Sequence, residues 1–355
     1  MSIPMRTPPC IFVLCFVGML ALFASTPERC RAAGEEYRAP VQPFSSGQLS
    51  ATMQVSPVWE PLLRRLAGDG ISGPDVEAMF AGLGGDISQE PMGRKMRELY
   101  TSKFLRQPPD PSAPKTPRPR LYKDVVTAEN AALCRNFLQQ YAPAFALAEL
   151  RYGVPKEIAV SLLFVETRLG TVLGKVSAFY TLASMASCSR PEDIGRWLPQ
   201  LPGYESRLDW MTEVMPRRSD WAYKELRALI VFTRAQGTDP LTMPGSIYGA
   251  VGMCQFMPSN LAHYGADGDG DGVVDLFTVP DAVASLSRYL ALHGWKAGIS
   301  RQRQHALLKT YNRADIYANT ILALSDVVLG VATAPAPSTA GKASVKASQG
   351  SRQAR

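Results

Sequence analysis

The chain has 355 residues, of which 46% are hydrophobic and 19% are charged. This composition is typical of a folded globular protein and excludes a wholly disordered chain. The net charge of +7 says little about partners, because most of the excess lies in the first 33 residues and in the acid-free tail after Gly330. The body between them is close to neutral, so we expect no nucleic-acid-binding surface.

Residues 1–33 are predicted to be an export signal. Arg6 precedes an uncharged run, Ile11–Ala24, which is short for a membrane span and typical of the hydrophobic part of a signal peptide. An uncleaved anchor is the alternative. Neither Cys15 nor Cys30 follows a lipoprotein-type sequence, so no lipid anchor is expected. We predict an exported protein of the periplasm or cell envelope.

The rest of the chain divides by composition. Residues 34–106 contain a helical region, residues 107–120 form a proline-rich linker, residues 121–330 form the main domain, and residues 331–355 are predicted to be a disordered tail. Because strand signals are sparse, the fold class is predicted to be mainly α. Apolar spacing predicts helices in the main domain at Thr127–Tyr152, Val154–Gly170, Trp221–Gln236, Val279–His293 and Ala314–Leu329.

Glu166 is the most informative residue of the main domain. It stands near the C-terminal end of an apolar helix, where the helix dipole and the apolar surroundings both disfavour a charged carboxyl. Ile158, Leu162, Val165 and Leu169 recur at helical spacing and are predicted to be its buried stripe. Glu166 is therefore a candidate general acid for cleaving a glycosidic bond. A surface glutamate paired with Arg168 is the alternative.

A glycine-rich segment at Gly245–Asn260 is the second candidate site. Ser246 and Gln255 offer hydrogen bonds without charge, and the glycines allow close backbone approach. Such a segment suits sugar hydroxyls and N-acetyl groups. A plain turn that leads into a helix is the alternative.

The third pattern is an acidic loop that starts at Asp267. Asp267, Asp269 and Asp271 stand at positions 1, 3 and 5 of an EF-hand-like loop, and the Val273 carbonyl stands at position 7. Position 12 is a threonine, so Asp281 at position 15 is the predicted substitute for the usual glutamate. We expect a structural Ca²⁺ here and no organic cofactor, with a solvated Asp-Gly turn as the alternative.

Three cysteines remain after the signal, Cys134, Cys188 and Cys254. Their number is odd and their spacing matches no metal motif. One disulfide with a free thiol, and three buried free thiols, both remain open.

Taken together, these segments resemble the membrane-bound lytic transglycosylase B family, whose members cleave peptidoglycan. The resemblance is carried, in order, by YGVPKEIAVSLLFVETRLG, MPRRSDW, GSIYGAVGMCQFMPSN, the acidic loop with VPDAVASLSRYLALHGW, and TYNRADIYA. It implies a lysozyme-like catalytic domain, with an N-terminal helical region and a calcium-binding loop.

The resemblance also implies roles for individual residues. Glu166 corresponds to the single catalytic acid. Residues expected to hold the glycan are Ser246, Gln255, Tyr289, Tyr311, Asn312, Tyr317 and Tyr122. Arg217 and Arg218 correspond to a basic pair near the peptide or acid groups of the substrate. The expected calcium ligands are Asp267, Asp269, Asp271, Asp281 and the Val273 carbonyl.

The chain departs from the family in two places. Only Lys296–Thr310 lies between Trp295 and the Tyr311–Asn312 pair, which is expected to open the final helix, so a small β-rich insertion is absent. Conversely, Ser187–Glu213 is longer than expected. The cleft is therefore predicted to be more open on one side and reshaped on another.

The predicted function is cleavage of the bond between N-acetylmuramic acid and N-acetylglucosamine, with formation of a 1,6-anhydromuramic acid end. Two alternatives remain, a muramidase that hydrolyses the same bond and a calcium-braced peptidoglycan-binding scaffold without activity. The expected partners are glycan strands and other cell-wall enzymes, and the protein is predicted to be a monomer.

Overall fold

The computed structural model describes residues 54–106 and 120–333. The predicted export signal, most of the linker and nearly all of the C-terminal tail lie outside these residues. Within them the chain is mainly helical, as predicted, with twelve α-helices and two strands of two residues each. The predicted domain boundaries stay predictions.

The N-terminal helical region contains three α-helices. After a 3-10 turn at Pro57–Trp59, these are α1 (Glu60–Gly68), α2 (Pro74–Ala81) and α3 (Glu90–Tyr100), which continues into a π-helical turn at Thr101–Leu105. Aromatic contacts join this region to α7 (Ala178–Ser187). The ring centroids of Phe80 and Phe179 are 5.3 Å apart, and those of Trp59 and Tyr180 are 6.4 Å apart.

The main domain contains the other helices. These are α4 (Ala128–Gln140), α5 (Ala142–Tyr152), α6 (Lys156–Thr167), α7, α8 (Leu208–Gln236), α9 (Pro258–Tyr264), α10 (Val279–Leu292), α11 (Arg301–Tyr311) and α12 (Asp315–Leu329). The strands β1 (Val176–Ser177) and β2 (Pro244–Gly245) pair antiparallel, with Val176 opposite Gly245. The segment between α7 and α8 forms 3-10 turns at Pro191–Ile194, Leu198–Gln200 and Tyr204–Arg207.

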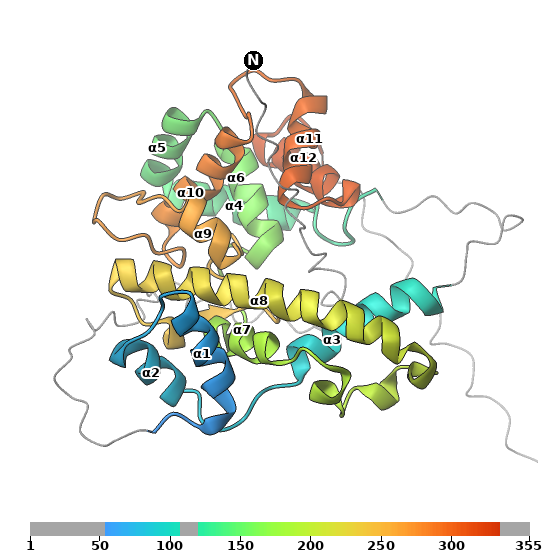
Figure 1. Cartoon of the computed structure of the whole chain (residues 1–355). Helices are drawn as coiled ribbons and strands as arrows, with labels where there is room; N and C mark the ends of the chain where they lie inside the picture. The colour runs from blue at the N-terminus through green and yellow to red at the C-terminus, as the bar shows by residue number, and fades with distance from the viewer. Residues whose placement is uncertain (1–53, 107–119, 334–355) are drawn as a thin grey trace, which may run out of the picture.

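The long helix α8 runs across the middle of the molecule (Figure 1). It packs on α7 and α3 on one side and on α9 on the other. In Figure 1, α1, α2, α3 and α7 lie below it, and α4–α6 and α9–α12 lie above it. The prediction began this helix at Trp221, but it continues back through Pro216 to Leu208. One interior proline removes a single backbone hydrogen bond, and the packing on both sides offsets that loss.

Helix α6 lies at the centre of the upper part and contacts α4, α5, α10 and α12. The predicted buried stripe is therefore too narrow. Every residue from Ile158 to Phe164 is buried, whereas Val165 and Leu169 are only partly buried. A helix with apolar residues on all sides is buried because neighbouring helices surround it.

The single helix predicted at Thr127–Tyr152 is wrong, because the structure has two helices that separate at Tyr141. Pro143 occupies the second position of α5, and a proline has no N–H to continue the hydrogen-bond ladder of α4. The predicted start is correct, since the Thr127 hydroxyl accepts a hydrogen bond from the Asn130 amide at 3.1 Å.

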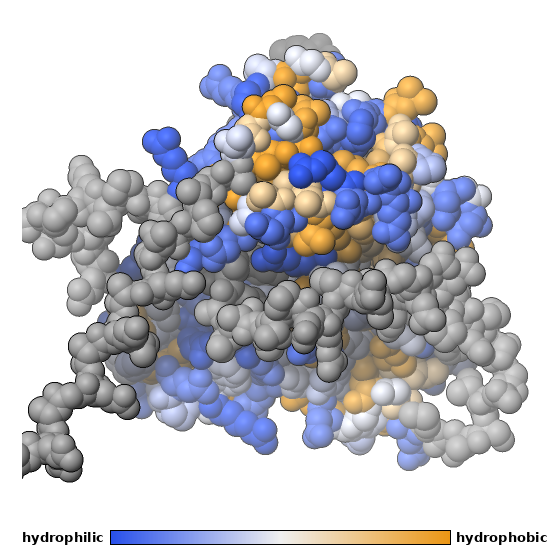
Figure 2. Space-filling view, turned by 180° about the vertical axis from the view of Figure 1, so that it is seen from behind, coloured by the Kyte–Doolittle hydropathy of each residue, from blue (hydrophilic) through white to orange (hydrophobic). Residues whose placement is uncertain are grey.

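Helix α5 also carries apolar residues on its exposed side. The side chains of Leu147 and Leu150 are 49% and 84% exposed. Viewed from behind, the upper part of the molecule shows hydrophobic residues among hydrophilic ones (Figure 2). Apolar residues on both faces weaken the helical period on which a sequence-based boundary depends.

The expectation that Tyr311–Asn312 opens the final helix is wrong. Tyr311 is the last residue of α11, Asn312 is its C-cap, and the final helix begins at Asp315. Helix α11 was not predicted because its sequence is mostly polar. It begins after Ser300, whose hydroxyl accepts a hydrogen bond from the Arg303 amide.

The three cysteines Cys134, Cys188 and Cys254 are buried free thiols. The sequence left open either one disulfide with a free thiol or three buried free thiols, and the structure has the three buried free thiols. Across residues 54–106 and 120–333, every helix is too short or too polar to span a membrane.

Gly93 in α3 is expected to be intolerant of any side chain. A Cβ atom there would lie 2.2 Å from Cγ of Trp197, so Gly93→Ala must displace the indole. We expect it to lower the free energy of unfolding by about 1–3 kcal/mol, measured by urea unfolding. The control is Gly68→Ala in α1, where a Cβ meets nothing within 4 Å. That substitution should be neutral or stabilising by up to about 1 kcal/mol, and an equal loss in both variants would contradict the packing argument.

Candidate functional site

Glu166 is the penultimate residue of α6, and its side chain is partly exposed. Burial raises the pKa of its carboxyl to about 7. The Tyr317 hydroxyl donates a hydrogen bond to Oε1 at 2.5 Å, and this bond lowers the pKa by stabilising the charged form. The burial effect is the larger, so Glu166 holds a proton at neutral pH far more often than an ordinary glutamate. The pKa agrees with the direction predicted from the sequence.

The backbone turns sharply directly after Glu166. Arg168, Leu169 and Gly170 all have positive φ angles, of 52°, 59° and 86°. The helix ends at Thr167, three residues before the end predicted at Gly170. Two non-glycine residues in the left-handed region carry strain that the surrounding structure must support.

Thr167 provides part of that support, although sequence reasoning did not single it out. Its hydroxyl donates to the Met253 carbonyl at 2.8 Å and accepts from the Gly170 amide at 3.0 Å. It thereby ties the end of α6 to the segment that carries Gln255. The only sequence signal for this role was the position of Thr167 directly after a candidate acid. Its contact with Met253 could not be predicted, because the two residues lie far apart in the chain.

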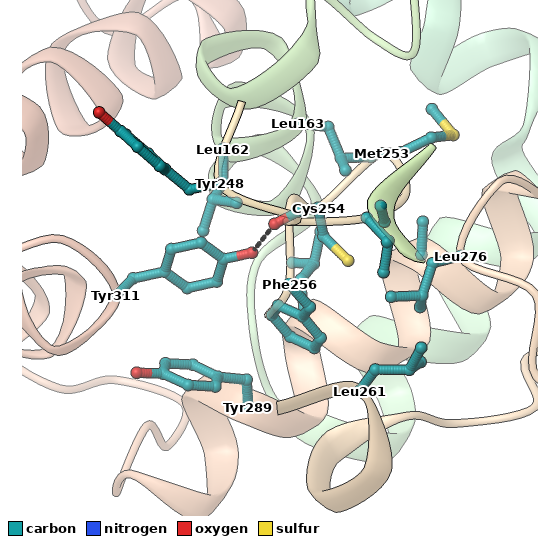
Figure 3. Packing of buried hydrophobic residues seen from close by; sticks show 14 of the residues in the cluster. Leu162, Leu163, Tyr248, Met253, Cys254, Phe256, Leu261, Leu276, Tyr289 and Tyr311 are labelled. Atoms are coloured by element: carbon teal, nitrogen blue, oxygen red, sulfur yellow. Dashed lines mark hydrogen bonds between the residues drawn. The ribbon is translucent and has the colours of Figure 1, made fainter. Parts of the chain in front are cut away.

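Predicted glycan-binding tyrosines gather beside Glu166. The rings of Tyr311 and Tyr317 are stacked, with centroids 6.3 Å apart, and Tyr289 meets Tyr311 edge-on at 5.0 Å. The Tyr311 hydroxyl donates to the Cys254 carbonyl, as Figure 3 shows. Tyr122 belongs to the same group, since burial and the charge of Glu166 both raise its pKa.

The glycine-rich segment forms a compact loop beside this group. Val251 and Phe256 pair as a β-bridge, and Gln255 between them has a φ of 50° and bonds through Nε2 to the Gly252 carbonyl at 3.0 Å. A Cβ at Gly252 would lie 2.3 Å from Cβ of Leu276. Gly252 therefore allows the loop to pack closely against Leu276. This internal role is additional to the close approach of a ligand that the sequence predicts for these glycines.

Ser246 and Asn312 both have local partners. The Ser246 hydroxyl accepts hydrogen bonds from the amides of Tyr248 and Ala250, at 3.3 and 3.0 Å. Asn312 Oδ1 accepts from the Ala314 amide at 3.2 Å. Each side chain thus shapes the turn in which it stands.

Sequence reasoning also missed a polar cluster that connects α3 with the glycine-rich loop. Lys95 is only 2% exposed, and its Nζ lies 2.7 Å from Glu98 and 3.7 Å from the ring centroid of Tyr248. The Tyr248 hydroxyl donates to Glu98 at 2.6 Å. Since Tyr248 follows Ser246 in the loop, α3 helps to hold that loop in place. No local signal could have paired residues 150 positions apart.

The predicted basic pair lies within α8. Arg217 is exposed and pairs with Glu213 at 2.6 Å. Arg218 is half-buried, and burial lowers the pKa of its guanidinium. In the described part of the chain, no hydrogen bond or ion pair connects either arginine with Glu166.

The acidic loop brings three of its carboxylates together. Oxygen atoms of Asp267, Asp269 and Asp281 lie within 4.8 Å of one another. Asp281 is 2% exposed and accepts hydrogen bonds from the amides of Gly268 and Asp275, at 2.7 and 2.6 Å. Burial raises its pKa to about 6, against the lowering effect of these two hydrogen bonds, and the charges of Asp269 and Asp267 add a smaller increase. Asp271 is outside this group of three and accepts a bond from the Val273 amide.

The loop is also connected with the Gln255 segment. The Met253 amide donates to the Leu276 carbonyl at 2.8 Å. The acidic loop therefore helps to hold the Gln255 segment in place.

The comparison with known families agrees with this arrangement. The family described as Transglycosylase SLT domain matches residues 54–307, which is most of the chain. The chain belongs to this family. The resemblance inferred from the sequence is thereby confirmed.

Individual relatives of this SLT-family chain are similar over different extents. Membrane-bound lytic murein transglycosylase B of Escherichia coli (strain K12) is 34% identical over 188 residues, which cover 53% of this chain and 45% of that protein. The match therefore spans less than half of the length of that relative.

Solved structures with low sequence identity share the fold. Lytic transglycosylase SltB1 from Pseudomonas aeruginosa has a TM-score of 0.57 at 21% identity, covering 78% of this chain and 98% of that one. Escherichia coli lytic transglycosylase Slt35, in complex with calcium, has a TM-score of 0.55 at 21% identity, covering 79% and 96%. The SLT-family chain therefore has the mainly helical fold of these proteins.

Proposed function

We propose that this protein is a lytic transglycosylase that cleaves the β-1,4 bond between N-acetylmuramic acid and N-acetylglucosamine in peptidoglycan. The product is a strand that ends in 1,6-anhydromuramic acid. The observation that carries the proposal is the Glu166 carboxyl, whose pKa burial raises to about 7. A carboxyl that holds its proton at neutral pH can act as a general acid.

In this proposal Glu166 acts twice. It first donates its proton to the glycosidic oxygen, which leaves with the N-acetylglucosamine side of the strand. The positive charge that develops at C1 of the muramic acid is stabilised by the N-acetyl group of the same sugar. Glu166, now a carboxylate, then takes the proton of the 6-hydroxyl, whose oxygen bonds to C1. The enzyme ends in its starting protonation state, and no water is consumed.

The surroundings of Glu166 support a mechanism with one carboxylate. Most glycosidases use a pair of carboxyl groups, about 5–10 Å apart. The influences on the pKa of Glu166 are burial and the Tyr317 hydroxyl, and no charged neighbour among the described residues contributes. This agrees with a site in which no second ionised carboxylate lies close beside Glu166.

The remaining cleft residues take binding roles in this proposal. Tyr317 orients the Glu166 carboxyl, and the glycan lies along the tyrosines and the glycine-rich loop. The residues that would contact it are Ser246, Gln255, Tyr289, Tyr311, Asn312, Tyr317 and Tyr122. Arg217 and Arg218 would meet acidic groups of the peptides further along the strand.

We further propose that the acidic loop holds a structural Ca²⁺. The carboxylates of Asp267, Asp269 and Asp281 lie within 4.8 Å of one another, and hard oxygen ligands suit this cation. Burial and, more weakly, the like charges of Asp269 and Asp267 raise the pKa of Asp281, so a bound cation would stabilise its charged form. Asp271 and the Val273 carbonyl would complete the site.

The function is tested by mass spectrometry of the muropeptides that the protein releases from purified peptidoglycan. Anhydromuramyl products are the expected result. Reducing-end products, heavier by one water, would identify a muramidase instead. Binding to peptidoglycan without release of fragments would identify a scaffold. The export signal predicted at residues 1–33 would deliver this activity to the cell envelope, where peptidoglycan lies.

The rate of cleavage should fall as pH rises through about 7, because the first step needs a protonated Glu166. Above that pH the decrease should approach about tenfold per pH unit. Tyr317→Phe removes a hydrogen bond that lowers the Glu166 pKa, so the alkaline limb should move to higher pH whatever happens to the maximal rate. A pH–rate profile of both proteins measures this. An alkaline limb at the same pH in both proteins would mean that the limb reports a group other than Glu166.

A further inference from the structure

A cavity of about 300 Å³ lies between α9, α10 and α11, beside the tyrosines of the candidate site. One part of its lining is aromatic and consists of Tyr264, Tyr289 and His293. The rings of Tyr289 and His293 are stacked with centroids 4.1 Å apart, and Tyr264 meets Tyr289 edge-on at 4.7 Å. Tyr289 is 2% exposed, whereas Tyr264 and His293 are partly exposed, so these two rings form the aromatic wall that a sugar can reach.

The other part of the lining is polar and positively charged. Lys309 and Arg313 supply two cations and Asn260 supplies a neutral amide, whereas none of the lining residues within 54–106 and 120–333 is acidic. Lys309 also bonds to Asp315 at 2.7 Å, but Asp315 lies outside the lining and its side chain is 69% exposed. A solvated surface pair of this kind is weak, so Lys309 can exchange it for an anionic ligand.

The cavity is connected with Glu166 through consecutive aromatic contacts. Tyr289 lines the cavity and meets Tyr311, and Tyr311 stacks on Tyr317, which bonds to Glu166. Figure 3 shows Tyr289 and Tyr311 lying one beside the other next to Phe256. The rings of Tyr289, Tyr311 and Tyr317 are themselves buried, so these contacts place the cavity close to Glu166 through the packed core.

We infer that this cavity is a subsite for a carboxylate carried by the muramic acid residues of the strand, with Lys309 and Arg313 as its cationic ligands. The inference rests on the proposed function, because it names a group of the same substrate. Peptidoglycan offers two sources of this chemistry, the lactyl carboxylate of muramic acid itself and the carboxylates of the attached peptide. Asn260 is placed to bond an N-acetyl or peptide amide.

The test is titration calorimetry with the inactive Glu166→Gln protein and three ligands of equal glycan length. These are a muropeptide strand, the same strand after removal of its peptides, and a chito-oligosaccharide without carboxylates. Lys309→Met and Arg313→Gln are each added to this background. Asp315→Asn is the matched control, since it breaks the same ion pair as Lys309→Met but keeps the cation.

Each cation removal should weaken binding of acid-bearing strands by about tenfold, as expected for one charge-assisted hydrogen bond. Binding of the chito-oligosaccharide, and binding by Asp315→Asn, should not weaken. A loss confined to the muropeptide strand assigns the peptide carboxylates, and a loss with both strands assigns the lactyl group. Equal losses for all three ligands, or none, would overturn the subsite. If the parent protein binds no glycan at all, both the subsite and the proposed function are wrong.

Discussion

Replacing Glu166 with glutamine will abolish most of the activity and at the same time stabilise the fold. Loss of the general acid should lower the rate of glycan cleavage by on the order of 10³-fold or more. The stabilisation follows from the carboxyl pKa, which burial raises to about 7 from an ordinary value of 4.5. As pH rises from about 4.5 to about 7, the unfolded chain releases this proton while the folded chain keeps it, so the stability of the wild type falls. The glutamine side chain does not ionise, so the stability of the variant does not fall in this way.

The difference in unfolding free energy between the two proteins should therefore grow with pH and reach at most roughly 3 kcal/mol above pH 7. Urea unfolding at about pH 5 and about pH 8 measures it. Glu157→Gln provides the matched control, because Glu157 stands in the first turn of the same helix and pairs with Lys156. It should keep its activity. Unfolding curves for the Glu166 variant that parallel the wild type at both pH values would show that the carboxyl is not desolvated.

Removing calcium should lower the melting temperature of the wild type far more than it lowers the initial rate. At a free calcium concentration of a hundred times Kd, binding to the folded state contributes about 2.7 kcal/mol. For a domain of this size that corresponds to roughly 5–10 °C in melting temperature. The rate should change less, because the loop reaches the site only indirectly, through the Leu276–Met253 hydrogen bond, and none of its aspartates influences the Glu166 carboxyl.

Asp281→Asn should remove the response to calcium, and Asp193→Asn should leave it intact. The two aspartates are comparable, since each accepts hydrogen bonds from two backbone amides, but only Asp281 lies in the carboxylate group. Differential scanning calorimetry with and without EDTA makes the comparison. A melting temperature that EDTA does not move would mean that the loop is a solvated turn.

Local patterns were sufficient for the parts of the site that one segment defines. Glu166 near the end of an apolar helix, and the alternating aspartates with Asp281 downstream, could be recognised because helix period and ligand spacing depend only on neighbours in the chain. Local patterns failed where apolar residues stand on both faces, as in α5, or where they are few, as in α11. They also missed Thr167 and the Lys95 cluster, whose partners lie far along the chain.

The sequence by itself determined the family, the candidate acid and the four aspartates of the acidic loop, of which the structure brings three together. The tertiary structure decided the state of these groups. The pKa of Glu166 depends on the helices that bury α6 and on Tyr317, which stands 151 residues away. The basic cavity exists only because α9, α10 and α11 converge. Desolvation and hydrogen bonding are properties of an enclosed space, and only the packing of distant segments creates that space.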